Sequence, residues 1–305
     1  MATDCSLADF RFDGSTSAET LIHLERDDFH GHGLTISGEG YRLELDVLHC
    51  SFSGTGLSVG FTADATPVIH WLDLRYNRFE GDGIGTGISL TGPCGYDEWQ
   101  DYRGIIGWNQ VHNYDTGIGL SCCDVNGSGP ESSHVEVDVV RNTIVGNNDG
   151  IVCAAVADGL SGSMAGAYCQ PRVWNNVIAH NSGCAFREGK ETHDEEGDTW
   201  TDPKEFITND LYDNGCMYLD EGTDELNSIG EVNALEGAYD NLSVPPRFVD
   251  AAGGDYHLAA DSPLIDRGSV GGPFAGWIDF DGDPRVMDGD HDGFAWPDVG
   301  ADEVP

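Results

Sequence analysis

The sequence contains very few basic residues. Only 14 Lys and Arg residues stand against 54 Asp and Glu residues, and the formal net charge at pH 7 is −40. Nucleic-acid binding needs a basic surface, so this deficit argues against a nucleic-acid partner. It equally disfavours attachment to an anionic membrane surface. The charge suits surroundings in which salt or calcium screens self-repulsion.

Long apolar runs are also absent. No stretch approaches the ~20 apolar residues that a transmembrane helix needs, so we expect no membrane insertion. No secretory signal peptide is recognisable, and we expect the export signal to have been removed. The nine cysteines favour an oxidising compartment. These features predict an extracellular or cell-surface protein.

What the sequence does have is a repeat. Its template is an Asn, an apolar residue two positions on, often a second Asn five positions on, and then Gly and an apolar residue. The first Asn of each copy is Asn77, Asn109, Asn142, Asn176 or Asn209, so the steps are 32, 33, 34 and 33 residues. Self-similarity at a fixed period is typical of a solenoid.

The repeat unit predicts strands. Short β-branched runs, such as Val137, Val139 and Val140, flank a compact Asn/Asp/Gly turn. One unit cannot bury its apolar face alone, so the units must stack. Asn suits the recurring corner because it tolerates the left-handed conformation and its amide can bond to the copies above and below. We therefore predict an all-β, right-handed parallel β-helix over residues 1–232, followed by an irregular capping or anchoring segment over 233–305. The alternative is an open sandwich with accidental Asn-Gly turns.

Two cysteines follow the repeat. Cys184 and Cys216 occupy the same template position in successive units, so they should stack. They form either a disulfide or a ladder of buried thiols. The odd total of cysteines leaves at least one unpaired or joined to another chain.

Longer insertions follow the same strand of each unit and should project from one side of the solenoid. They cover 91–103, 121–134, 154–170 and 187–203, and they are acidic and aromatic. Flat aromatic rings flanked by carboxylates can stack on sugars and bond their hydroxyls, so we predict a polysaccharide or glycan partner. The candidate contacts are Asp97, Glu98, Trp99, Tyr102, His193, Glu195, Asp198 and Trp200. The alternative is that the aromatic side chains pin the loops and the acids form a solvated rim.

An aspartate-rich stretch near the C-terminus predicts a calcium site. Asp288, Asp290 and Asp292, followed by Gly293, match the start of an EF-hand loop, but Val299 stands where such loops have Glu. Further oxygens could come from the preceding turn. The candidate ligands are Asp279, Asp281, Asp283, Asp288, Asp290 and Asp292. Asp-Gly runs also form plain turns, which is the alternative.

The C-terminal motifs resemble a known module. Residues 246–250, 254–258, 262–268, 279–285 and 298–303 are similar in order and spacing to the choice-of-anchor Q domain of secreted bacterial β-helix proteins. The Asn-corner repeats before them resemble the pectate-lyase-like superfamily. These resemblances imply export and cell-surface attachment. They imply no particular reaction, because the superfamily is functionally mixed.

Two classes of function follow. The first is a non-catalytic scaffold, such as an adhesin, matrix component or filament subunit. The second is a polysaccharide lyase or glycosidase. No catalytic motif of the superfamily is present in its order, and the −40 charge would repel a polyanionic substrate, so we favour the scaffold. With no N-terminal capping helix and an odd cysteine, we also expect self-association through the ends or one side, dependent on screening ions.

Overall fold

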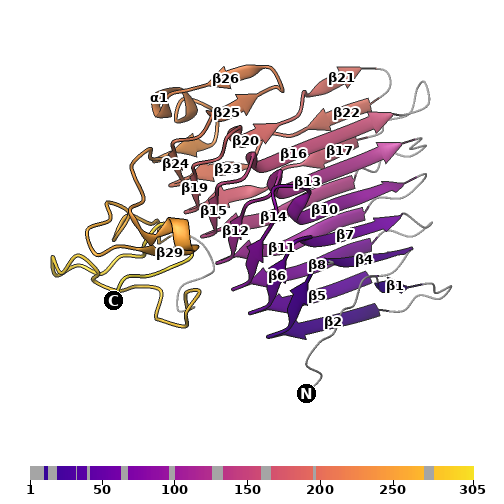
Figure 1. Ribbon diagram of the computed structural model, residues 1–305. Helices are drawn as coiled ribbons and strands as arrows, with labels where there is room; N and C mark the ends of the chain where they lie inside the picture. The colour runs from indigo at the N-terminus through magenta and orange to yellow at the C-terminus, as the bar shows by residue number, and fades with distance from the viewer. Residues whose placement is uncertain are drawn as a thin grey trace.

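The protein folds as a parallel β-solenoid (Figure 1). The computed structural model describes residues 10–12, 19–31, 33–39, 42–62, 68–95, 100–125, 133–158, 166–194, 197–270 and 278–305. Each turn of the chain adds one strand to each of three sheets, here termed A, B and C. Within them, strands from successive turns pair in parallel; β21–β22 and β25–β26 are antiparallel pairs. The predicted fold class is confirmed.

The strands of each sheet follow in stacking order. Sheet A contains β1 (Phe10–Phe12), β4 (Leu34–Glu39), β7 (Leu57–Thr62), β10 (Thr86–Gly95), β13 (Thr116–Val125), β16 (Asp149–Asp158), β20 (Cys184–Glu188), β25 (Cys216–Asp220) and β26 (Asp224–Leu226). Sheet B contains β2 (Glu19–Glu25), β5 (Arg42–Leu48), β8 (Val68–Arg75), β11 (Gln100–Gly107), β14 (Ser133–Val140), β17 (Gly166–Cys169), β22 (Gly197–Trp200) and β21 (Thr192–Asp194), with β18 (Arg172–Trp174), β23 (Glu205–Ile207) and β27 (Ala238–Tyr239) beside them. Sheet C contains β3 (Asp28–His30), β6 (Ser51–Ser53), β9 (Arg78–Glu80), β12 (Gln110–His112), β15 (Thr143–Val145), β19 (Val177–Ala179) and β24 (Asp210–Tyr212).

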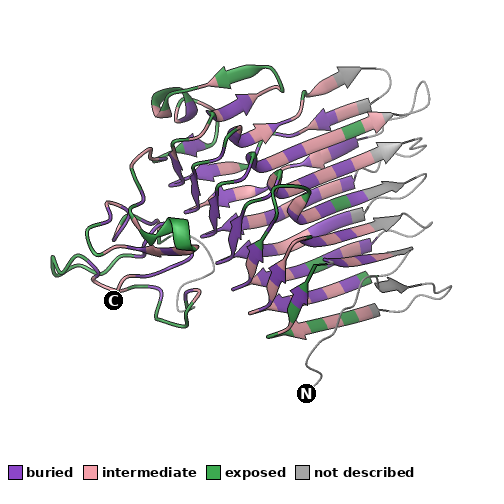
Figure 2. Ribbon diagram, in the orientation of Figure 1, coloured by how far each residue is buried: buried purple, intermediate pink, exposed green. Residues whose placement is uncertain are grey.

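The core runs along the solenoid axis. In β14, buried and partly exposed residues alternate, as Figure 2 shows for many strands, because successive side chains of a strand point to opposite faces. Equivalent inward residues stack from turn to turn. Phe29, Phe52 and Phe79 form such a column, with ring centroids 4.6 and 4.5 Å apart.

The corner between sheets B and C is made by an asparagine ladder. Oδ1 of Asn176 accepts hydrogen bonds from the backbone N–H and the Nδ2 of Asn142, at 2.8 and 2.9 Å, and Nδ2 of Asn142 donates to Ile106 O at 2.9 Å. The ladder is confirmed, but the left-handed residue is the one before the Asn, such as Trp108 (φ 52°) or Arg141 (φ 55°). The Asn itself turns inward, where its amide bonds to both neighbouring turns.

The C-terminal end of the solenoid is closed. The β25–β26 hairpin folds over it, and the short helix α1 (Ile229–Val232) follows. Ser228 and Glu231 form a capping box at the helix start, and Val232 is fully buried against the core. The ladder continues to Asn241, so the last turn extends beyond residue 232.

Residues 243–305, here termed the tail, fold back along the flank formed by sheet C (Figure 1). They include β28 (Phe248–Asp250), the 3-10 turn η1 (Ala251–Gly253) and β29 (Asp255–Leu258). Leu264 and Val299 pack on Val177 of β19. Ala301 N–H donates to Thr143 Oγ1 at 3.1 Å. The tail therefore covers the side of the solenoid, whereas residues before it close the end.

The structure also decides between the alternatives for the stacked cysteines. Cys184 and Cys216 form a disulfide, with Cα atoms 4.4 Å apart, and Cys123 is disulfide-bonded as well. Cys50, Cys153 and Cys169 are buried free thiols. No helix among the described residues is long and apolar enough to cross a membrane.

Candidate functional site

The structure describes only part of the predicted set of sugar contacts. Asp97, Glu98, Trp99 and Glu195, and the side chain of His193, lie outside the described residues. Tyr102 is fully buried: its ring packs on His70 with centroids 5.0 Å apart and its hydroxyl donates to Thr91 O, so its assignment to a surface platform is wrong. Asp198 and Trp200 lie in β22 of sheet B.

Much of the predicted insertions is strand. The ends of sheet A and the beginnings of sheet B continue into them, as when β13 runs to Val125 and β14 begins at Ser133. Consequently, Trp200 belongs to the outer face of a regular sheet. The aromatic residues stack there because equivalent positions of neighbouring strands lie about 4.8 Å apart.

Trp200 is the last of three stacked rings on sheet B. His134 and Tyr168 have ring centroids 4.6 Å apart, and Tyr168 and Trp200 are 4.2 Å apart with nearly parallel planes. Sequence reasoning missed His134 and Tyr168, although each precedes its ladder Asn by eight positions (142 − 134 and 176 − 168). Because the rings stack face to face, their faces are mostly covered by one another, and little ring surface is left for a sugar to stack on.

A hollow beside this row has an exposed tryptophan at its edge. Its volume is about 350 Å³, and it is lined by Trp71, Arg103, Gly104, Ile105, Glu136, Asp138 and Arg172. Trp71 is 45% exposed. Gly104 has φ +130°, and a Cβ there would lie 1.9 Å from Leu72 O, so only glycine fits this part of β11.

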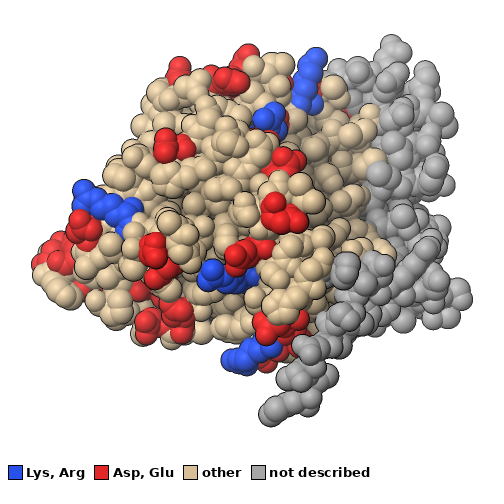
Figure 3. All heavy atoms as spheres, in the orientation of Figure 1, with Lys and Arg blue, Asp and Glu red and all other residues tan. Residues whose placement is uncertain are grey.

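The charges on this face are paired. Arg103 lies 2.9 Å from Asp101, Arg172 lies 2.9 Å from Asp138, and Lys204 contacts Glu136. The hydrogen bond from His134, helped by Lys204, lowers the pKa of Glu136 to about 2. On the face of the molecule that Figure 3 shows, the basic side chains likewise lie beside acidic ones. Despite the chain's charge, the outer face of sheet B carries cation–carboxylate pairs.

The six predicted metal ligands are divided among separate places. Asp279 is fully buried, and its two oxygens accept backbone hydrogen bonds from residues 281, 282, 283 and 303, so it holds the turns of the tail. It joins no group of potential ligands among the described residues. Asp283 and Asp292 join no group of potential ligands among the described residues, and Asp292 Oδ1 accepts the Phe294 N–H.

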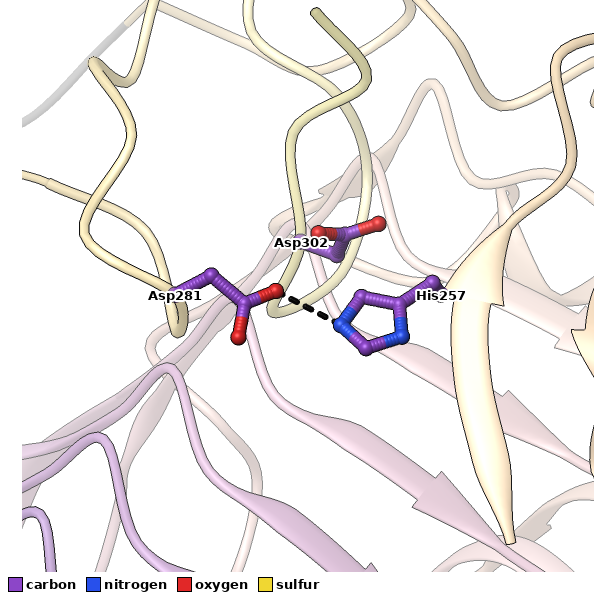
Figure 4. A group of neighbouring side chains, drawn as sticks. All are labelled: His257, Asp281 and Asp302. Atoms are coloured by element: carbon purple, nitrogen blue, oxygen red, sulfur yellow. Dashed lines mark hydrogen bonds and ion pairs between the residues drawn. The ribbon is translucent and has the colours of Figure 1, made fainter. Parts of the chain in front are cut away.

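The remaining predicted ligands fall into two groups. Asp288 and Asp290 lie with Asp266, which sequence reasoning missed, and their oxygens are within 4.8 Å of one another. Asp281 instead lies with His257 and Asp302, again within 4.8 Å (Figure 4). Burial raises the pKa of Asp302 to about 7.

A third group lies near the closed end of the solenoid. It contains Glu188, Asp202 and Asp220. Glu188 is 1% exposed; it accepts hydrogen bonds from the Tyr218 hydroxyl at 2.7 Å and the Glu221 N–H at 2.9 Å. Burial, with a hydrogen bond to Asp220, raises the pKa of Glu188 to about 9, so it is protonated at neutral pH.

Comparisons with known proteins identify no family. No protein-family model and no curated protein matches the chain. The resemblance of the C-terminal motifs to choice-of-anchor Q domains is therefore unsupported. Among solved structures, the crystal structure of pectate lyase Pel9A is similar, with 11% identity and a TM-score of 0.36, over 97% of this chain and 86% of that chain. At this similarity, nothing about activity transfers to this protein.

The described arrangement thus offers two kinds of chemistry. The face of sheet B presents an exposed indole beside hydrogen-bonding ion pairs, which suits a hydroxyl-rich ligand. The tail and the closed end gather carboxylates, which suits cations or protons. In the third group, both oxygens of Glu188 already accept hydrogen bonds from the protein.

Proposed function

We propose that this protein is a non-catalytic extracellular scaffold that binds a glycan on the outer face of sheet B. The observation that carries the proposal is the hollow beside Trp71. Its volume of about 350 Å³ lies in the range of small-ligand sites. Trp71 would supply an apolar face for a sugar ring, and the paired Arg103 and Arg172 would supply donors for hydroxyls.

The paired charges favour a neutral glycan. Each cation at the hollow is already balanced by a carboxylate, and the whole chain carries −40. A polyanion would therefore meet repulsion without a free cationic site to compensate it. A neutral sugar chain would use the same groups as hydrogen-bond donors and acceptors without that cost.

The disulfide Cys184–Cys216 supports the extracellular part of the proposal, because disulfides persist in oxidising compartments. We also propose that the group of Asp266, Asp288 and Asp290 binds Ca²⁺. Its donors are all carboxylate oxygens, which hard cations prefer, and they come from two segments of the tail.

Replacing Trp71 tests the glycan proposal. Trp71→Ala should weaken binding of the native protein's glycan by more than about 1 kcal/mol, or more than about fivefold, because it removes the ring face. Trp296→Ala is the control, since Trp296 lies in the tail and is 47% exposed, close to the 45% of Trp71. A glycan array first selects the ligand, and affinity electrophoresis then compares the variants.

The proposal fails if the native protein binds no glycan on the array, or if both variants lose affinity equally. The polysaccharide-active enzyme remains the second candidate. The raised pKa of Glu188, which lies beside Asp202, favours it, because glycoside hydrolysis needs a carboxylic acid that stays protonated together with a second carboxyl group. Release of reducing sugar by the native protein, lost in Glu188→Gln, would favour the enzyme over the scaffold.

A further inference from the structure

Three distant segments of the tail meet at His257, Asp281 and Asp302. His257 lies in β29, Asp281 in the turn after Asp279, and Asp302 close to the end of the chain. Figure 4 shows the Asp281 carboxylate facing the imidazole edge, with the Asp302 carboxylate beside both. One imidazole nitrogen and two carboxylate oxygens lie within 4.8 Å of one another.

The imidazole of His257 is held in a defined orientation. Its Nδ1 lies 2.5 Å from Asp255 Oδ1, and its Nε2 lies 2.6 Å from Asp281 Oδ2. A carboxylate at one ring nitrogen fixes the tautomer and aims the other nitrogen. This is the usual surrounding of a metal-binding histidine. Here, the aimed atom is Nε2, on the side of Asp281.

Asp302 lacks a partner for one of its oxygens. The residue is only 6% exposed, and Oδ2 accepts the Leu258 N–H at 3.1 Å. No described residue gives Oδ1 a hydrogen bond. A carboxylate that is nearly buried and accepts one hydrogen bond from the protein is costly to charge, and a cation between Asp302, Asp281 and His257 would stabilise its charged form.

We propose that His257, Asp281 and Asp302 bind a divalent transition-metal ion of the zinc class. Ligand atoms that each lie 2.0–2.2 Å from such an ion are at most about 4.4 Å apart, so a small closure of the group is enough. The imidazole nitrogen decides the class of ion. Ca²⁺ takes oxygen ligands, whereas Zn²⁺ accepts nitrogen and oxygen together. The all-carboxylate group at Asp266 is chemically distinct.

The ion would crosslink three segments of the tail. It would join β29 to the turn at Asp281 and to the last residues of the chain, beside the apolar contact of Leu258 and Val299 with β19. Because an ion that binds only the folded tail favours the docked state by mass action, Zn²⁺ should raise the melting temperature. This inference does not depend on glycan binding.

Zinc titration of the full, chelator-treated chain tests the site. Calorimetry should show one Zn²⁺ bound per chain, with affinity reduced at least tenfold in His257→Gln. His180→Gln is the matched control, because His180 also pairs with an aspartate, Asp213 at 2.9 Å, but belongs to no ligand group among the described residues. Asp302→Asn, which keeps the side-chain shape, should weaken binding as well.

Two measurements make the outcome decisive. Circular dichroism confirms that each variant is folded, and melting with and without Zn²⁺ should show a shift in native protein and in His180→Gln that His257→Gln lacks. Equal zinc affinity of native protein and folded His257→Gln and Asp302→Asn variants would overturn the proposal. Absence of saturable zinc binding, or a larger shift with Ca²⁺ that also needs His257, would overturn it too.

Discussion

The asparagine ladder shows how single residues set the corner between sheets B and C. Each ladder Asn is buried, and its amide group bonds to turns on both sides. The residue before it takes the left-handed conformation, which is unfavourable for a side chain with a Cβ. Tyr, Trp, Arg and Asn all occupy that position, so the ladder's bonds, and not the identity of the turn residue, hold the corner.

This explains what could be predicted at the residue scale. The Asn positions were visible because their amides have a specific partner in every turn. The left-handed position was not, since Tyr76, Trp108 and Arg141 share no side-chain property. Asp266 was missed for a similar reason: it lies 22 residues before Asp288, and folding of the tail, which no local spacing encodes, brings them together.

Asp210 makes a prediction about pH. It is fully buried on sheet C; Oδ1 accepts the Val244 N–H at 2.8 Å and Oδ2 has no partner, and burial raises its pKa to about 7. The folded state therefore holds a proton that the unfolded state releases above about pH 4. Its contribution to stability is complete below that pH and is lost as pH rises through 7.

We expect Asp210→Asn to reduce this loss. Between pH 5 and pH 8, the unfolding free energy of the native protein should fall by about 2.5 kcal/mol more than that of the variant, as measured by urea denaturation. Comparison with the native protein cancels the opposite effect of buried His112, whose pKa is lowered to about 4. Asp240→Asn, at an exposed site, is the control. An unchanged pH slope in Asp210→Asn contradicts the argument.

At the scale of elements, strands were easier to predict than the face that they present. The repeat period and the β-branched runs indicated stacked strands, because every turn must supply apolar strand residues to the core. The sequence did not predict the hollow on the outer face of sheet B, because the side chains that line it belong to different turns. Trp71, Arg103 and Glu136 are neighbours only through the pairing of β8, β11 and β14. The prediction for Tyr102 is wrong because this residue occupies an inward position of β11 and not a surface loop.

Calcium binding is testable in the tail. Excess Ca²⁺ should raise the melting temperature of the native protein, because an ion at Asp266, Asp288 and Asp290 joins two segments and relieves their mutual repulsion. Asp290→Asn should abolish most of that shift. Asp292→Asn should keep it, since Asp292 belongs to no ligand group in the described chain. Identical melting curves with Ca²⁺ and with chelator would refute the calcium site.

At the scale of the whole molecule, the two ends of the solenoid differ. The inward residues Ile22 and Leu24 of β2, the first strand of sheet B, are only partly buried, while α1 and the β25–β26 hairpin close the other end. A filament that grows by head-to-tail contacts requires an unpaired strand edge at both ends of each solenoid. We therefore propose that self-association, if it uses an end, pairs two N-terminal edges and stops at a dimer.

Light scattering across a calcium series checks this. At −40 per subunit, association should strengthen as ions screen repulsion, and the mass should level off at two chains. Growth without limit, or fibres in electron micrographs, would contradict the closed pair. A monomer at every ionic strength would remove self-association from the proposed function.

The course of the tail also has a mechanical meaning. Its last residues are bound to the middle of the flank, where Ala301 meets Thr143 of β15, and not to the tip of the rod. A pull applied at Pro305 would therefore act sideways on the rod. The force would break the contacts of the tail one after another before it reached the stacked turns of the solenoid. A protein held at Pro305 would therefore lie along its support, and the tail would unfold while the solenoid stayed folded.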